Sequence, residues 1–354
     1  MNFDQSPMLV IWEATQACDL ECVHCRAAAQ PERNPGELTT EQGYKLLDEI
    51  RSFGEPLMVF TGGDPLKRPD LYDLIRYSVK IGLRTNVTPS ATPLLTAEAI
   101  RAFKAAGVTR MAISVDGPDA ATHDDFRGIP GTFDRAMFAL RHARDIGLET
   151  QFQTTVTRRN MAQLNEVYEI AKEVRTKMWS LFFLIVTGRA AAEDDLMAPE
   201  YEQVFEFMYE LSKTAPFPIK TTEAMHYRRY LAQRMKADHG AVSESAKGVA
   251  FRTAGVSDGK GFVFVSHTGE IFPSGFLPIT AGNVLHDSLT SVYRNSELFR
   301  SLRDTELRGG KCGVCEYLKV CGGSRSRAYA LSGDFLAEDP RCTYQPHLAE
   351  AIGG

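Results

Sequence analysis

Short apolar runs alternate with helical patterns along the first 213 residues of the chain. Each run is rich in β-branched or aromatic residues and leads into a polar loop, which is typical of a buried strand. Between runs, apolar residues return at helical spacing, as Tyr44, Leu47 and Ile50 do within residues 39–53. The runs predict six strands, at residues 8–12, 57–60, 83–87, 108–115, 148–156 and 179–186.

The predicted helices carry start and stop signals. Thr39 and Gln42 have the spacing of a capping box at the start of the first helix. Four helices are followed at once by glycine, which commonly adopts the left-handed conformation that ends a helix. These glycines are Gly54, Gly82, Gly107 and Gly147. Strands that alternate with helices form parallel sheets. Six units are too few for a closed eight-fold barrel, so we predict an α/β fold with a partial (β/α)6 barrel of the TIM type.

The rest of the chain has a different pattern. A polar segment at 243–248 predicts a flexible loop. Two short strands are expected at 261–265 and 270–272, and a helix at about 289–302. We therefore expect three parts, namely a barrel at 1–213, a helical and loop connection at 214–258, and a smaller C-terminal α+β domain at 259–354.

Composition narrows the class of protein. Of the 354 residues, 44% are hydrophobic and 24% are charged, as in ordinary soluble domains. A net charge of −5 gives no basic field for nucleic acid or an anionic membrane, so neither partner is expected. The sequence shows no secretion signal and no apolar stretch of about 20 residues. Its seven cysteines therefore favour metal binding in a reducing cytoplasm over disulfides.

Three cysteines follow the first predicted strand within eight residues. Cys18, Cys22 and Cys25 form a CxxxCxxC pattern, whose thiolates can hold three irons of a cubane cluster and leave the fourth iron open. Buried structural cysteines are the alternative. The charged Asp19 and Glu21 between them argue against a buried apolar segment. The spacing therefore favours a metal cluster with one free iron.

Four more cysteines lie near the C-terminus. Four thiolates match either a Cys₄ iron–sulfur cluster or a structural zinc site. Zinc ribbons usually contain two CxxC pairs, and only one is present. Spacing alone leaves both metals open. The residues are Cys312, Cys315, Cys321 and Cys342.

Candidate ligand-binding residues follow the predicted strands, and α/β folds bind ligands at the carboxyl ends of their strands. Gly62 and Gly63 have no Cβ and would admit a close ligand. Asp64 could accept hydrogen bonds from an ammonium group. A simple turn explains the same Gly-Gly-Asp-Pro sequence equally well.

Further polar residues follow later strands. Asp116 could bind ribose hydroxyls, with Asn86 and Ser114 adding polar contacts, although an aspartate before glycine often only makes a turn. Arg189 could pair with a ligand carboxylate or remain solvated. The basic stretch at 225–236 could gather carboxylates, but a solvated helix face is commoner for such a run. His123 and His267 have no spacing partner that would make them ligands.

With these residues in place, the chain resembles the radical S-adenosylmethionine (SAM) superfamily, specifically members with a C-terminal SPASM-type auxiliary domain. The marks are the three N-terminal cysteines, Thr-Gly-Gly-Asp-Pro at 61–65, Ile-Ser-Val-Asp-Gly at 113–117 and Phe-Arg-Gly-Ile-Pro-Gly-Thr-Phe at 126–133. The resemblance implies a 4Fe–4S cluster on those cysteines, with SAM chelating the open iron, and a reducing partner such as flavodoxin or ferredoxin. It places Gly62, Gly63 and Asp64 near the SAM amino group, and Ser114 and Asp116 near its ribose.

The C-terminal pattern is similar to members that modify tetrapyrroles in haem d1 synthesis or the alternative haem pathway. They share CxxCxxxxxC, a Gly-Gly pair and a distal cysteine. Ser274 stands where two-cluster relatives often have cysteine, so we expect one auxiliary 4Fe–4S cluster with four cysteine ligands.

The resemblance implies an oxidoreductase whose 5′-deoxyadenosyl radical abstracts hydrogen, decarboxylating or removing carboxylate side chains of a tetrapyrrole. Peptide-modifying members share the scaffold, so a ribosomally made peptide is the alternative substrate. A non-catalytic iron–sulfur or zinc protein would not need Gly62, Gly63 and Asp64. The sequence alone does not identify catalytic acid or base residues.

Overall fold

The computed structural model describes residues 2–238 and 255–347. The parallel barrel strands are β1 (Leu9–Glu13), β2 (Leu57–Thr61), β3 (Thr85–Val87), β4 (Arg110–Ser114), β5 (Glu149–Val156), β6 (Trp179–Phe183) and β7 (Ile219–Thr222). Later strands are β8 (Phe262–Val265), β9 (Glu270–Phe272) and β10 (Gly282–Asn283). The described strands form one sheet in the order β10-β9-β8-β1-β2-β3-β4-β5-β6-β7.

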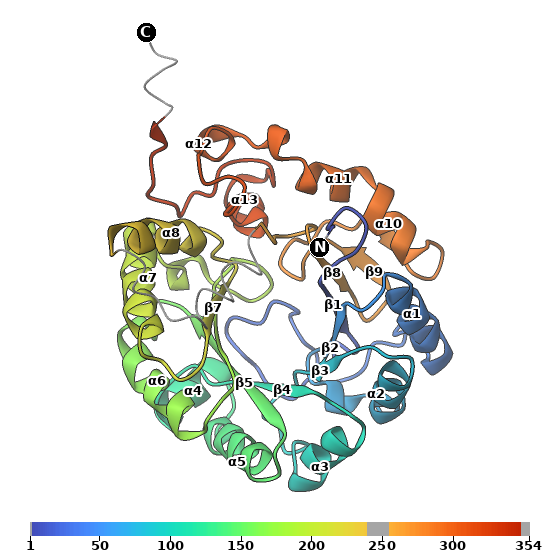
Figure 1. Ribbon diagram of the computed structural model, residues 1–354. Coiled ribbons are helices and arrows are strands. Elements are labelled where there is room, and N and C mark those ends of the chain that lie inside the picture. Colours follow the sequence, from blue (N-terminus) through green and yellow to red (C-terminus); the bar gives the residue numbers. More distant parts are fainter. Residues whose placement is uncertain (1, 239–254, 348–354) are drawn as a thin grey trace.

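Helices connect the strands and surround the curved sheet (Figure 1). The barrel helices are α1 (Thr40–Ser52), α2 (Leu71–Lys80), α3 (Ala97–Ala105), α4 (Ala120–Arg127), α5 (Thr132–Asp145), α6 (Leu164–Glu173), α7 (Ala198–Ser212) and α8 (Tyr227–Ala237). The C-terminal helices are α10 (Leu289–Asn295), α11 (Glu297–Arg303), α12 (Gly310–Gly313) and α13 (Arg325–Ser332). Short 3₁₀ turns are η1 (Pro65–Lys67), η2 (Met161–Gln163), η3 (Ala192–Asp194) and η4 (Thr305–Leu307).

Buried and half-buried residues alternate along the strands, which separates the hydrophobic core from the barrel interior. In β5, Phe152 and Val156 are fully buried, while the intervening Gln151, Gln153 and Thr155 are half-buried. Successive strand residues point to opposite faces, so one set packs beneath the helices and the other lines the interior. The hydrophobic core therefore lies between sheet and helices, and the interior of the barrel is lined by both polar and apolar side chains.

The predicted α/β fold with a partial barrel is confirmed, and β1 to β6 match the six predicted runs. The capping box is present, since the Thr39 hydroxyl accepts from the Gln42 N–H at 3.3 Å and the Gln42 side chain accepts from the Thr39 N–H at 2.8 Å. The four helix-ending glycines have φ between +70° and +108°, as the pattern predicts.

Two elements differ from the sequence prediction. β7 adds a seventh parallel strand, which the pattern did not indicate because Ile219 is its one buried residue and the rest are polar. The single helix expected at about 289–302 is two helices, because the Ser296 backbone is extended and its hydroxyl accepts from the Phe299 N–H at 3.4 Å, starting α11. The polar segment 243–248 lies outside the described residues.

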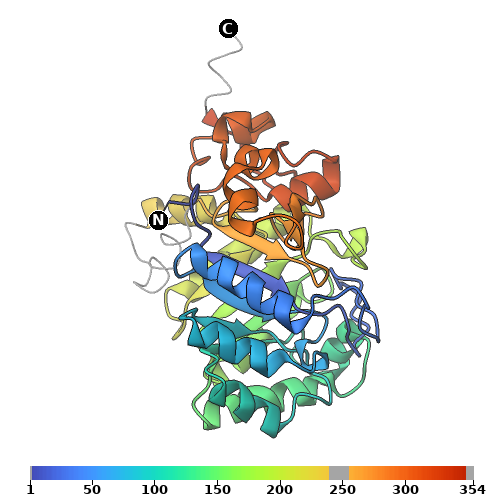
Figure 2. The same ribbon diagram turned by 90° about the vertical axis from the view of Figure 1, so that its right-hand side faces the viewer.

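The C-terminal strands extend the barrel sheet. β8 pairs in parallel with β1, where Trp12 lies opposite Val265, and β9 and β10 follow in antiparallel order. Helices α10 to α13 lie together on one side of the barrel, as Figures 1 and 2 both show. The C-terminal part and the barrel are therefore joined through backbone hydrogen bonds.

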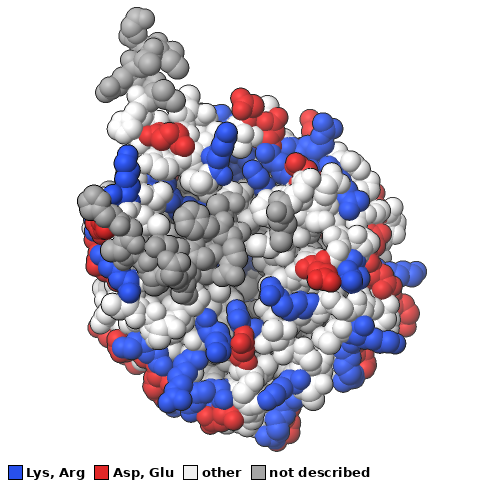
Figure 3. Space-filling model, in the orientation of Figure 1, with Lys and Arg blue, Asp and Glu red and all other residues white. Residues whose placement is uncertain are grey.

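Positive and negative side chains are mixed over the face that Figure 3 presents, and no single-sign patch dominates it. Among the described residues, no helix is long and apolar enough to cross a membrane.

The α1 core contact gives a test of the packing. Leu47 is fully buried, whereas Lys45 on the same helix is exposed. Leu47→Ala should lower the unfolding free energy by about 2–5 kcal/mol, because it removes buried methyl groups and leaves a cavity. Lys45→Ala should change it by less than about 0.5 kcal/mol. Thermal melting of both variants checks this, and equal melting temperatures would contradict the assigned core.

Candidate active site

The cysteine loop between β1 and α1 lies at the carboxyl end of the barrel strands. Cys18 and Cys22 are buried and Cys25 is half-buried. All three line one cavity of about 220 Å³. The structure thus brings the predicted cysteines together with three other predicted residues. Those residues are Gly62, Gly63 and Ser114.

Each of the three sulfurs accepts a hydrogen bond from the protein. Burial raises the pKa of the Cys18 thiol to about 11, and the N–H aimed at its sulfur opposes that rise. Donors directed at sulfur stabilise thiolates, the form that binds iron. The donor set therefore fits a bound iron–sulfur cluster. The pairs are Leu20 N with Cys18 Sγ (3.4 Å), Ala29 N with Cys25 Sγ (3.4 Å) and Arg127 Nη1 with Cys22 Sγ (3.7 Å).

Four glycines let the backbone of neighbouring segments approach the cysteine loop closely. A Cβ added at any of them would lie too near a loop carbonyl oxygen, so no larger residue fits without moving the loop. The distances from the added Cβ are 2.5 Å for Gly62 to Thr15 O, 2.5 Å for Gly63 to Ala17 O, 2.8 Å for Gly128 to Glu21 O and 2.3 Å for Gly188 to Cys25 O. Gly62 and Gly63 are thus required by packing against the loop, besides lining the cavity.

Asp64 is fully buried and is bonded to protein groups. Its carboxylate accepts from the Thr92 hydroxyl at 2.6 Å and from the backbone N–H groups of Leu66 and Ser90 at 3.1 and 3.4 Å. It therefore fixes the loop after β2 as a turn residue. Burial nonetheless raises its pKa to about 6. Its contact with the SAM amino group stays a prediction.

Asp116 is also fully buried, and forms an ion pair with Arg127. Its carboxylate accepts from the Thr155 N–H at 2.7 Å. Burial alone would raise the pKa of Asp116, but the Arg127 charge and the nearby imidazoles bring it below its ordinary value. The pair links β4 to the sulfur of Cys22 through one guanidinium. A ribose contact of Asp116 stays a prediction.

Asn86 and Arg189, the other two predicted ligand-binding residues, do not line the cavity of the N-terminal cysteines. Asn86 lines a second, larger cavity inside the barrel, and its buried Oδ1 has no hydrogen-bond partner among the described residues. Arg189 donates to the carbonyl oxygens of Cys22 at 3.0 Å and Ala29 at 3.3 Å. Arg189 thus braces the cysteine loop, and any contact with a ligand carboxylate stays a prediction.

Sequence reasoning missed two residues of this site. Arg127 contacts both Asp116 and Cys22, yet its motif was recognised without assigning the side chain a role. Ser90 lies near Cys18 Sγ at 3.7 Å and donates to the Gly63 carbonyl at 2.7 Å. The position of Ser90 in the polar loop after β3 could have indicated that it belongs to the site.

The C-terminal cysteines also gather. All four line one cavity beside Gly322 and Gly323, and none forms a disulfide. Two backbone N–H groups point at sulfurs, Gly323 N to Cys321 and Asp339 N to Cys312, both at 3.4 Å. Burial raises the pKa of the Cys321 thiol to about 12. This donor set also fits thiolates that bind a cluster.

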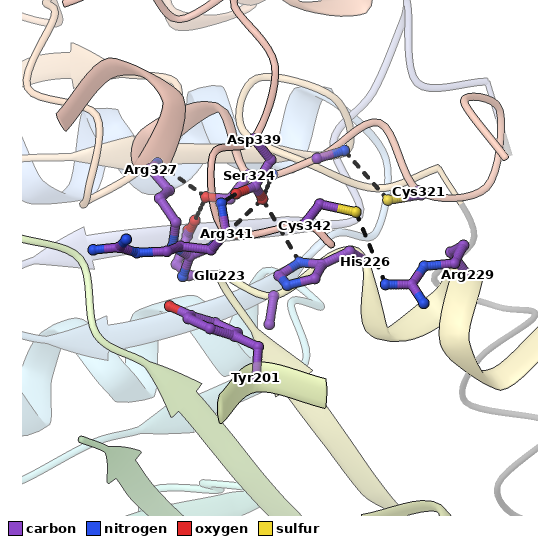
Figure 4. A network of polar contacts seen from close by, with 12 residues as sticks. Tyr201, Glu223, His226, Arg229, Cys321, Ser324, Arg327, Asp339, Arg341 and Cys342 are labelled. Atoms are coloured by element: carbon purple, nitrogen blue, oxygen red, sulfur yellow. Dashed lines mark hydrogen bonds and ion pairs between the residues drawn. The ribbon is translucent and has the colours of Figure 1, made fainter. Parts of the chain in front are cut away.

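Buried charged residues lie beside the cavity of the four C-terminal cysteines (Figure 4). Asp339 lies 3.4 Å from Arg327 and 3.6 Å from His226, and its carboxylate accepts from the Ser324 N–H at 2.9 Å. Burial opposes ionisation of Asp339, but Arg327 brings its pKa down to about 2. Arg229 reaches the sulfur of Cys342 at 3.8 Å.

Among the described residues, no three His, Cys, Asp or Glu side chains converge as they would around a single metal ion. In a cubane each thiolate binds a different iron, so its ligands surround a cluster and do not meet at one point.

Comparison with known proteins agrees with this geometry. Residues 12–175 match the radical SAM superfamily. The AdoMet-dependent heme synthase of Nitratidesulfovibrio vulgaris is 44% identical over 97% of this chain and 94% of its own. The enzyme of the same name from Methanosarcina barkeri is 41% identical over 96% of this chain and 97% of its own. The solved structure of Streptococcus suis SuiB bound to S-adenosylmethionine shares the fold, with a TM-score of 0.75 at 17% identity over 96% of this chain and 78% of that one.

The chain belongs to the radical SAM superfamily and is a radical SAM enzyme. Membership implies a 4Fe–4S cluster and SAM, and the first cavity has thiols, hydrogen-bond donors and space that fit both. The predicted likeness to tetrapyrrole-modifying members is also confirmed by the heme synthases among its relatives.

Gly188 offers a test of how the loop is held. Gly188→Ala should lower the iron bound per chain and SAM cleavage, because its Cβ would displace the Cys25 carbonyl. Gly333→Ala is the matched control, since Gly333 has a similar positive φ of +77° but no atom within 4 Å of an added Cβ. Iron content and 5′-deoxyadenosine yield are measured for both. Equal values in the two variants would refute the packing role.

Proposed function

We propose that this enzyme decarboxylates a carboxylate side chain of an iron-bound or metal-free tetrapyrrole in haem synthesis. The observation that carries the proposal is the 44% identity to an AdoMet-dependent heme synthase over nearly the whole of both chains. The larger cavity supports it, because its walls are mainly apolar and aromatic side chains. Such walls suit a flat, apolar ring system.

When bound, the cluster and SAM supply a 5′-deoxyadenosyl radical that takes a hydrogen atom from the substrate. The chain's residues orient and enclose the reaction. Gly62, Gly63 and Ser114 line the side of the cavity where SAM would bind, and Asp64 and Asp116 support that wall. Conversion of a propionate to a vinyl group then releases carbon dioxide and leaves one electron for a one-electron acceptor.

The two cavities adjoin each other inside the barrel. Arg26, Thr61 and Phe182 line both of them, as do Thr88, Gln153 and Phe276. A substrate in the barrel interior would therefore lie next to the side of the site where SAM would bind. This proximity supports hydrogen transfer between bound SAM and a tetrapyrrole side chain.

We further propose that the four C-terminal cysteines hold one auxiliary 4Fe–4S cluster. Their shared cavity and the N–H groups aimed at Cys312 and Cys321 support this assignment. Ser274 lies buried with its hydroxyl 3.4 Å from the Glu223 carboxyl, and contributes no thiol for a second auxiliary cluster. In this proposal residues 259–354 form the cluster-binding part, residues 1–213 the barrel and residues 214–258 the connection. Flavodoxin or ferredoxin would supply electrons.

A substrate assay tests the function. Reconstituted, reduced enzyme with SAM should form 5′-deoxyadenosine in proportion to added iron coproporphyrin III, together with carbon dioxide and a product lighter by the carboxyl groups. Mass spectrometry of the porphyrin follows this. Turnover only with a ribosomally made peptide would instead favour the peptide-modifying alternative, and no consumption of any tetrapyrrole would defeat the proposal.

Metal analysis tests the two clusters. Wild type should contain about eight irons per chain, because two cubanes hold four each. Cys22→Ala should retain about four and lose SAM cleavage, since it removes one ligand of the SAM-binding cluster. Cys342→Ala should also lose iron but keep the N-terminal cluster. Zinc at the C-terminal cysteines with about four irons in wild type would contradict the auxiliary cluster, and SAM cleavage by Cys22→Ala would contradict the mechanism.

A further inference from the structure

Two half-buried cations line the barrel cavity. Lys220 on β7 and Arg228 on α8 both line it, and β7 and α8 are neighbours in Figure 1. Neither forms an ion pair with a carboxylate of the described residues. Among the described residues, Arg228 donates to the carbonyl oxygens of Val256 at 2.7 Å and Val320 at 3.4 Å. Burial lowers the pKa of Arg228 to about 10, and the charge of the nearby Cys321 opposes that shift. Burial, with the charges of Arg110 and Arg228, lowers the pKa of Lys220 to about 8.

The other arginines of α8 are paired with acidic residues of α7. Arg229 pairs with Glu202, and Arg234 pairs with Glu206 at 3.1 Å. The basic stretch at 225–236 therefore largely contacts α7. It does not form the solvated helix face that such runs usually form. Arg228 also belongs to this stretch; it lines the barrel cavity and has no carboxylate partner in the part of the chain that the structure describes.

The two carboxyl groups that line the same cavity are already engaged. Asp258 accepts from the N–H groups of Arg325 at 3.0 Å and Ser326 at 3.1 Å, at the start of α13. Glu223 is bonded to the Ser324 hydroxyl at 2.6 Å. Burial beside Asp258 raises the pKa of Glu223, which favours its neutral form. These carboxyls therefore do not balance the two cations.

A cation partly withdrawn from solvent without a carboxylate partner is costly, so an interior lined by two such cations is suited to an anionic ligand. We propose that Lys220 and Arg228 form a carboxylate anchor for the substrate. The anchor holds one carboxylate of the tetrapyrrole inside the barrel. Another side chain of the tetrapyrrole then faces the neighbouring cavity, where SAM would bind. The inference rests on the proposed function and adds the residues that position its substrate.

Binding measurements test the anchor in the full-length, reconstituted enzyme. The probes are iron coproporphyrin III and its tetramethyl ester, which has the same ring but no free carboxylate. Wild type should bind the acid at least tenfold more tightly than the ester. Lys220→Met should weaken binding of the acid at least tenfold, about 1.4 kcal/mol, and leave binding of the ester unchanged.

Two further variants and a stability measurement complete the test. Lys220→Arg keeps the charge and should retain most of the affinity for the acid. Lys236→Met removes an exposed lysine near the end of α8 and should bind both probes as wild type does. Loss of a half-buried charge that has no carboxylate partner should raise the melting temperature of Lys220→Met without ligand, so weak binding is not explained by unfolding.

The outcomes separate the two proposals. If wild type binds the acid and Lys220→Met binds it equally well, the anchor is wrong while the proposed function stands. If wild type binds and converts no tetrapyrrole, the proposed function fails and the anchor fails with it. Equal loss of the acid and the ester in Lys220→Met would also overturn the anchor, because the residue would then act on the ring.

Discussion

The close approach of glycine backbone to the cysteine loop is the constraint on which the site depends. The loop has little regular structure of its own, and its position is set by surfaces without side chains. Gly62 and Gly63 follow β2, and Gly188 follows β6, so opposite parts of the barrel contact the same loop. Arg189 adds hydrogen bonds to two loop carbonyls. A flexible segment is thereby held rigidly enough to position three thiols beside the SAM cavity.

Much of the fold could be predicted from the sequence because apolar periodicity reports burial. Strands that pack beneath helices, such as β5 with Phe152 and Val156, give a clear signal. β7 gives none, since its inward residues are polar and serve the cavity. The break at Ser296 was missed because a serine within an apolar period resembles an ordinary helix residue until its capping hydrogen bond is seen.

The candidate site shows the same division between local and distant information. The spacing of the cysteines can be seen in the sequence itself. It singled out the three cysteines that line the N-terminal cavity and the four that line the C-terminal cavity. The partners of Asp64 and Asp116 are set by chain crossings that no spacing contains, for example the contact of Arg127 with both Asp116 and Cys22. The position of Arg228 in the barrel cavity likewise depends on the direction in which one residue of a basic helix points.

The pairing of β8 with β1 has a consequence for how the protein is made. β1 cannot complete its hydrogen bonds until β8, about 250 residues later in the chain, has been synthesised. The cysteine loop is in the same situation, because Arg189 lies 167 residues beyond the Cys22 carbonyl that it binds. Contacts so distant in sequence form late during folding. The loop that carries the N-terminal thiols can therefore take its final position only after the chain has been synthesised beyond residue 189.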